Sequence, residues 1–199
     1  MLLQEINHRV KNSLQMTASM FNVQSRRTQD RAAGDDFRAA SARIHAIAQV
    51  HEQLYRGDVS GKLELGRYLK DLCKDLQRTV ASPGRPVSIQ VEGDNPALPL
   101  DKVTPLGLIV SELVTNAVKY AYPESRQDPL IAVSVQATAD TITLRVCDEG
   151  MGVPDGFEPK QSKGLGMRLV AALAEQLRGE LALERRPKGT CFAIRCPIA

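Results

Sequence analysis

The strongest constraint on this chain is the difference between its first 56 residues and the remainder. Residues 1–56 contain no proline and one glycine, Gly34, and apolar side chains recur there at steps of three and four in two long segments. That spacing is typical of amphipathic helices. Residues 26–36, between the two segments, are polar and predict a connection. We therefore expect a helical hairpin.

A hairpin of this length is too small to bury a core unaided. Both helices carry an apolar seam, and a second copy of the hairpin would cover both seams in a four-helix bundle. The sequence therefore predicts a homodimer through residues 1–56.

After Gly57 the pattern becomes mixed, with glycines, prolines and short strand-like runs. Helical patterns are predicted at 65–80, 101–122 and 166–179, and strands at 86–93, 130–140, 141–150, 179–185 and 189–197. Helices segregated from a largely antiparallel sheet predict an α+β fold, here a two-layer sandwich. We divide the chain into a hairpin domain, 1–60, and a second domain, 61–199.

Composition excludes several classes of protein. The net charge of +3, from 26 basic and 23 acidic residues, is too balanced to indicate a nucleic-acid partner. No apolar run approaches the ~20 residues of a membrane span, so this piece is expected to be cytoplasmic without membrane contact, whether its parent protein is anchored or soluble. The cysteines show no metal-ligand spacing and are expected to be reduced core thiols: Cys73, Cys147, Cys191 and Cys196.

A polar pair interrupts the most apolar of the predicted helices. Glu112 and Asn116, four residues apart, share one helical face. An amide oxygen beside a carboxylate suits Mg²⁺ that also carries phosphates, because Mg²⁺ takes few protein ligands. A solvent-facing stripe is the other interpretation of the same spacing.

Two glycine motifs follow. In DEGMG, a strand ends at Asp148, and Gly150 and Gly152 permit a tight turn and a close approach to a flat ligand. In KGLGMRLV, Gly164 and Gly166 lead into a helix, whose free N–H groups could contact phosphate oxygens. The context fits neither a P-loop nor a Rossmann turn. Taken alone, each motif could also be an ordinary turn.

Together, ELVTNAVKY, DEGMG, KGLGMRLV and KGTCFAI, over about residues 100–196, resemble the nucleotide-binding domain that sensor histidine kinases share with gyrase, Hsp90 and MutL, the GHKL or Bergerat fold. The resemblance implies ATP across the open face of the sandwich, with Mg²⁺ on Asn116 and the adenine amino group on Asp148. It further implies a lid at 153–163. The other implied nucleotide contacts are Gly150, Gly152 and Thr190 near the adenine, and Lys119, Gly164, Leu165 and Gly166 near the phosphates.

The hairpin adds a second resemblance. INHRVKNSLQ resembles the histidine box of sensor histidine kinases with the second HisKA-like type of dimerisation helices, and RIHAIAQVHEQLY and LGRYLKDLCKDL resemble their following helices. The resemblance implies that ATP phosphorylates His8 and that the phosphoryl group passes to an aspartate of a response-regulator receiver domain.

His8 alone, on an amphipathic helix, could equally be a solvated residue. As an acceptor it is chemically suitable, because a neutral imidazole offers a lone pair near neutral pH. Asn12 lies on the same helical face and could orient the ring, and Glu5 or Glu112 could receive the proton. The alternatives are a phosphotransfer scaffold without kinase activity and a GHKL-type ATPase in which Glu112 activates water.

Overall fold

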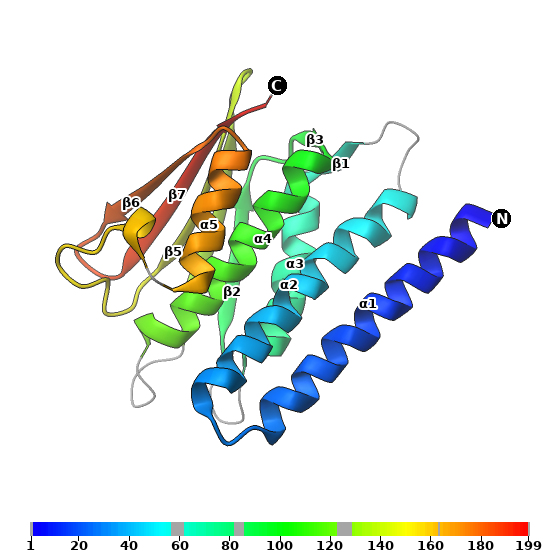
Figure 1. The fold of residues 1–199 in the computed structure, drawn as a ribbon. Helices are drawn as coiled ribbons and strands as arrows, with labels where there is room; N and C mark the ends of the chain where they lie inside the picture. The colour runs from blue at the N-terminus through cyan, green and yellow to red at the C-terminus, as the bar shows by residue number, and fades with distance from the viewer. Residues whose placement is uncertain (1, 57–61, 82–85, 123–128, 163, 199) are drawn as a thin grey trace.

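The structure is a computed structural model that describes residues 2–56, 62–81, 86–122, 129–162 and 164–198. One mixed sheet is covered on one face by three helices, and a helical hairpin lies on the outside of that helical layer (Figure 1). The predicted α+β class and the order of elements are confirmed.

The N-terminal hairpin consists of α1 (Leu2–Arg27) and α2 (Arg31–Arg56). The predicted connection over 26–36 is wrong in length, because only residues 28–30 separate the helices. The side chain of Asp30 accepts a hydrogen bond from the N–H of Ala33 at 3.4 Å, and such a cap lets α2 begin within the polar stretch. Farther along, Ser41 Oγ donates to the carbonyl of Ala18 at 3.1 Å, which sets the antiparallel register of the pair.

The main sheet has five strands in the order β2-β4-β5-β7-β6. They are β2 (Ser88–Gly93), β4 (Leu130–Ala137), β5 (Thr141–Asp148), β6 (Glu180–Arg185) and β7 (Thr190–Pro197). β2 and β4 run parallel and the other neighbours antiparallel. Side chains of β4 and β5 alternate between buried and half-buried, so one face carries the core. A two-stranded sheet of β1 (Lys62–Glu64) and β3 (Ala97–Pro99) was not predicted.

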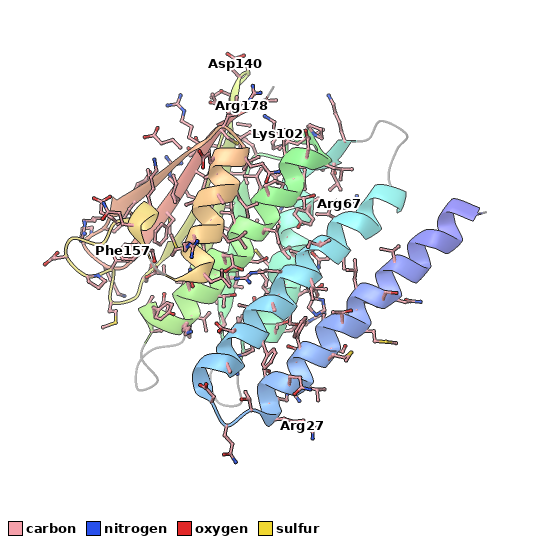
Figure 2. The ribbon with its side chains drawn as sticks, in the orientation of Figure 1. Arg27, Arg67, Lys102, Asp140, Phe157 and Arg178 are labelled. Carbon is pink, nitrogen blue, oxygen red and sulfur yellow. A yellow bond between two sulfur atoms is a disulfide. The ribbon has the colours of Figure 1, made fainter. Side chains whose placement is uncertain are left out.

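Three helices cover this sheet, namely α3 (Leu65–Val80), α4 (Leu100–Asn116) and α5 (Leu165–Gln176). The predicted helix over 101–122 changes its winding after Asn116 and continues as a π-helical turn, η1 (Ala117–Ala121). At the other end of α4, Lys102 Nζ donates to the carbonyl of Pro197 at 2.7 Å and ties the helix to the end of β7 (Figure 2). Within the described part of the chain, no helix has the length and apolar character to cross a bilayer.

The hairpin shares the core of the sheet domain through α2. Ala42, Ala46 and Val50 are buried in one cluster with residues of α3, α4 and the sheet. α1 is the outermost helix (Figure 1). One face of α2 is thus covered from within the same chain, whereas α1 leaves Met16 and Met20 exposed.

The cysteines differ from the prediction of four reduced thiols. Cys147 on β5 and Cys191 on β7 form a disulfide, while Cys73 and Cys196 are free and buried. The bonded pair lies directly opposite in the antiparallel register of β5 and β7, with Cα atoms 4.0 Å apart. The two residues are 44 apart in sequence, so only the strand pairing brings them together.

Candidate functional site

The predicted polar pair lies at the carboxyl end of α4. Glu112 is 3% exposed and does not face solvent, which rules out the solvent-facing interpretation for this residue. One turn later, Asn116 Nδ2 donates to Met167 Sδ at 3.4 Å, which leaves its amide oxygen available to a ligand. The first turn of α5 therefore packs directly against this polar face.

Gly166 explains how α5 comes so close. A Cβ atom at this position would lie 2.6 Å from Glu112 Oε2 and 3.7 Å from the side-chain amide of Asn116. A side chain there would displace either the Glu112 carboxylate, which Arg43 holds, or the first turn of α5. The glycine is needed for this approach, and the structure joins the ELVTN and KGLG motifs at one point.

The amino end of α5 offers donors to an anion. Gly164 is the N-cap residue, and no side chain caps the helix. The N–H groups of the first turn therefore have no side-chain acceptor, and the positive end of the helix dipole points the same way. This is the geometry in which a helix N-terminus holds phosphate. Leu165, the first residue of the helix, is exposed.

Asp148 ends β5 and is 6% exposed. Its Oδ1 accepts the N–H of Gly150 at 2.8 Å, and the backbone of Thr190 also donates to it. Burial raises the pKa of Asp148 above its ordinary value, although these two hydrogen bonds and the positive charge of Arg186 oppose the rise. The carboxylate is thus a desolvated acceptor fixed by backbone donors.

The π-helical turn after α4 positions the DEGMG loop. The Ala121 carbonyl accepts the N–H of Met151 at 2.8 Å, and a Cβ at Gly150 would collide with that same carbonyl. Tyr122 then donates its hydroxyl proton to the carbonyl of Leu130 at 2.6 Å and accepts the N–H of Glu149 at 2.9 Å. These contacts fix the loop between α4 and the sheet.

A cavity of about 230 Å³ lies beside this loop, between residues 150–153 and the turn 185–190 that joins β6 and β7. Thr190 is buried at its inner end. The turn carries three cations, and Lys188 pairs with Glu149 at 3.5 Å. Gly189 at φ 79° lies against the Asp148 backbone, where a Cβ would collide with the carbonyl. Gly150, Gly152 and Thr190, which were predicted to lie near the adenine, therefore line one cavity, whereas Asp148 is not among its lining residues.

The remaining predicted nucleotide contacts lie at the edges of this site. Lys119 is exposed on the π-helical turn, with Nζ 5.1 Å from the ring centroid of Tyr120. In the predicted lid, residues 153–162 are described and contain a short helix, η2 (Pro159–Gln161). Phe157 packs edge-on against Phe192 of β7 with ring centroids 6.5 Å apart (Figure 2). Whether this segment closes over a nucleotide stays a prediction.

The predicted phosphoacceptor is on the hairpin. His8 belongs to α1, but its side chain and that of Glu5 lie outside the described part of the structure. Asn12 is exposed on the same helix. The catalytic roles of His8, Asn12 and Glu112 therefore stay predictions.

Sequence reasoning missed the residue that faces Glu112. Arg43 of α2 donates through Nε and an Nη2 proton to the two carboxylate oxygens, at 2.5 and 2.9 Å. Hydrogen bonding to Glu112 raises the pKa of this guanidinium, and burial opposes the rise. A signal was present, since Arg43 lies three and seven residues before the buried Ala46 and Val50 and so shares their helical face.

The comparisons with known proteins agree with this arrangement. Residues 5–80 match the histidine kinase family HisKA_2, and residues 101–199 match the family of histidine kinase-, DNA gyrase B- and HSP90-like ATPases. The chain belongs to the histidine kinase family. The second match implies that the sheet domain of this histidine kinase chain binds ATP.

Individual relatives extend the similarity over nearly the whole chain. The sensor histidine kinase PdtaS of Mycobacterium tuberculosis is 31% identical over 198 residues, 98% of this chain and 39% of the relative. The histidine kinase domain of a blue-light-activated histidine kinase from Erythrobacter litoralis matches with a TM-score of 0.72 and 27% identity, over 98% of this chain and 90% of that one. The ATP binding domain of PrrB from M. tuberculosis, 22% identical with a TM-score of 0.55 over 71% of this chain and 99% of that chain, shares the fold. The chain thus spans well under half the length of PdtaS.

Proposed function

We propose that this chain is the core of a sensor histidine kinase that transfers the γ-phosphoryl group of ATP to His8. In this reaction a nitrogen of the His8 imidazole forms a bond to phosphorus, the bond to the bridging oxygen breaks, ADP leaves, and the imidazole loses its proton. The observation that supports the proposal is the close approach of Gly166 to Glu112 and Asn116, in a chain that matches both the ATPase family and the histidine kinase family.

Each part of the site has a role in this proposal. Asp148 accepts the adenine amino group, and the loop from Gly164 to Gly166 holds phosphate oxygens by its N–H groups. The amide oxygen of Asn116 suits a Mg²⁺ ion bound mainly by phosphates and water, which neutralises charge during transfer.

The two alternatives receive less support from the site. In an ATPase, Glu112 would have to activate water, but in the docked arrangement both of its oxygens accept hydrogen bonds from Arg43. A scaffold that only relays phosphate would have no use for a nucleotide site, so the buried Asp148 carboxylate and the uncapped amino end of α5 favour the kinase over the scaffold.

The proposed partners follow from the same chemistry. A phosphohistidine is a reactive phosphoryl donor, and we propose that it phosphorylates an aspartate of a response-regulator receiver domain. We also propose a homodimer through residues 1–56. The exposed side chains of Met16, Met20 and Val23 on α1, at 67%, 63% and 52% exposure, recur on one helical face and support such a contact.

The acceptor is tested by labelling. Incubation with γ-labelled ATP should label His8 alone, and the label should be labile to acid and stable to base, as a phosphoramidate is. Replacement of His8 by Ala should abolish labelling, because no other side chain combines a lone pair with the histidine-box position. The measurement is mass spectrometric mapping of the phosphopeptide under alkaline conditions.

The matched control is His45→Ala, which removes a half-buried imidazole from α2 and should leave labelling in place. ATP binding by both variants, measured by calorimetry, should equal that of the wild type because the nucleotide site is in the other domain. An acid-stable label, or a label that persists in the His8 variant, contradicts the proposal.

A further inference from the structure

The contact between the hairpin and the ATP-binding domain contains few apolar atoms. Toward α3 and α4, α2 presents mostly Ala42, Ala46 and Val50. Alanine side chains bury little area, so the hydrophobic contribution of this face is small. Polar side chains also join α2 to the other domain.

Some of these polar interactions are what we expect at an interface from which α2 can undock. Tyr68 of α3 donates to the Ala46 carbonyl of α2 at 3.2 Å, and Gln49 of α2 donates to the Asp75 carboxylate. Yet Gln49 Oε1 is buried without a hydrogen-bond partner among the described groups. Such an oxygen loses its hydration in the docked state and regains it when α2 moves away.

The Arg43–Glu112 pair is the strongest of the polar contacts. It is bidentate, with Glu112 3% and Arg43 22% exposed, so neither solvent nor salt screens it fully. If Arg43 is removed while α2 stays docked, the Glu112 carboxylate remains buried without its counter-charge, which is highly unfavourable. Undocking of α2 is the movement that lets water reach that carboxylate.

Glu112 also lies next to the first turn of α5, where the phosphates are proposed to bind. Its Oε2 is the atom nearest to the position of a Cβ on Gly166, in the loop proposed to hold phosphates. The carboxylate that Arg43 of the hairpin holds therefore lies close to the first turn of α5. A nucleotide bound at that turn would lie near the ion pair.

The docked hairpin does not present His8 at this site. The Ser41–Ala18 hydrogen bond sets Arg43 level with the middle of α1, near Met16. The backbone of His8 lies about 12 Å farther along α1 at a rise of 1.5 Å per residue, and α1 is separated from α4 by α2 (Figure 1). Phosphorylation from this site requires the hairpin to move.

We propose that the Arg43–Glu112 ion pair is an autoinhibitory latch that keeps the hairpin docked on the ATP-binding domain with His8 away from the phosphates. Opening the latch frees Glu112 and lets the hairpin bring His8 to the nucleotide. The inference rests on the proposed kinase function, because it concerns when that reaction can occur.

The test uses the full 199-residue chain and the variant Arg43→Gln. Without the guanidinium the undocked population rises, so amide hydrogen exchange in α2 should become faster and the initial rate of His8 labelling should increase. We expect about a tenfold increase, the ratio that corresponds to a shift of ~1.4 kcal/mol in the docking equilibrium. The variant Arg43→Lys, which keeps the charge but loses the fork, should fall between the two.

Arg145→Gln is the matched control, because it removes an arginine from a pair with Glu184 on the strands of the sheet, away from the polar contacts of α2, and should change neither readout. Faster exchange in α2 with labelling at or below the wild-type rate overturns the latch. So does unchanged exchange. If Arg43→Gln does not fold, Arg43→Lys decides by the same two readouts. An absence of His8 label in the wild type contradicts the kinase proposal instead, and the exchange data still report whether Arg43 holds α2 docked.

Discussion

The pKa of Asp148 is subject to opposing effects from its surroundings. Its burial disfavours the charged form, while the donors from Gly150 and Thr190 and the nearby Arg186 favour it, and the pKa remains above the ordinary value. A carboxylate in this position is a good acceptor for an amino group because water competes little. The same burial makes it sensitive to acid.

We predict that Asp148→Asn weakens ADP binding by about 1.5–3 kcal/mol, the contribution of a hydrogen bond to a charged group. In the wild type, affinity should fall as the pH drops through the raised pKa of Asp148, at a higher pH than an ordinary aspartate would require. Calorimetric titrations with ADP across the acidic range measure both effects. The Asn variant is the matched control, and its affinity should lack this component of the pH dependence.

The stability of the protein without nucleotide should depend on pH in the opposite sense to its affinity for ADP. The contribution of Asp148 to stability should grow as the pH falls, whereas its contribution to ADP affinity should shrink. Because the folded-state pKa of Asp148 is raised, the folded state binds a proton more readily than the unfolded chain does. The Asp148 contribution to the free energy of unfolding is therefore fully present below the unfolded pKa and is lost as pH rises through the folded one. The difference between the free energies of unfolding in urea of the wild type and of Asp148→Asn, measured across this pH range, isolates the Asp148 contribution. A difference that does not change with pH would contradict the raised pKa.

Among the elements, β5 and β7 are the pair most closely tied to the adenine side, since Cys147 precedes Asp148 and Cys191 follows Thr190. The disulfide fixes the two strands at this point. The other two thiols are shielded within the core, and burial raises the pKa of Cys73 to about 12. A thiol in that environment is almost entirely protonated and unreactive near neutral pH.

We predict that alkylation of the unfolded chain without reductant modifies Cys73 and Cys196, and that reductant adds Cys147 and Cys191. Reduction should lower the free energy of unfolding by about 2–4 kcal/mol, because a cross-link over this sequence separation restricts the unfolded chain. Peptide mass spectrometry and urea unfolding measure the two effects. In the double variant Cys147→Ser, Cys191→Ser, reductant should no longer change stability. Alkylation of all four cysteines without reductant would refute the cross-link.

Sequence patterns located nearly every element, because helices and strands leave periodic apolar signals. The alternating residues of β4 and β5 and the apolar helix α4 are of this kind. The motifs also predicted that Asn116 and Gly166 lie at one nucleotide site; the structure brings these two residues close together, and their binding roles stay predictions. Periodicity does not indicate which residues interact when they are far apart in the sequence. Arg43 and Glu112 are 69 residues apart, and no local pattern indicates that they meet. The winding change after Asn116 likewise depends on contact with the DEGMG loop.

For the whole molecule, the open question is how the outer surface of the hairpin is used. α2 is covered by its own chain, so the four-helix arrangement predicted from two apolar seams has to involve mainly α1 in this docked form. Met16, Met20 and Val23 form a narrow apolar strip on that helix. A second copy could bury such a strip on each side of a two-fold axis.

We predict a dimer in light scattering at about tens of micromolar, and a monomer for the double variant Met16→Glu, Met20→Glu, because each partner would bury two unpaired carboxylates. Gln15→Glu, Gln24→Glu is the matched control, since it adds the same charge at exposed polar positions of α1 and should remain dimeric. A monomeric wild-type protein at this concentration would contradict the proposed dimer, because the apolar strip on α1 would then not be buried by a second copy.

The burial of Ala46 beside residues of α3 and α4 has a consequence for how this chain can be divided. The two family matches end at residue 80 and begin at residue 101, whereas the sequence motifs suggest a cut near residue 60. A cut there would remove α2 and expose the inner sides of α3 and α4 to water, with Glu112 among them. The sequence divides into two modules, but in the docked form the two modules share one buried interior. A module that is exchanged for another must therefore fit the contact surface of the module that is kept.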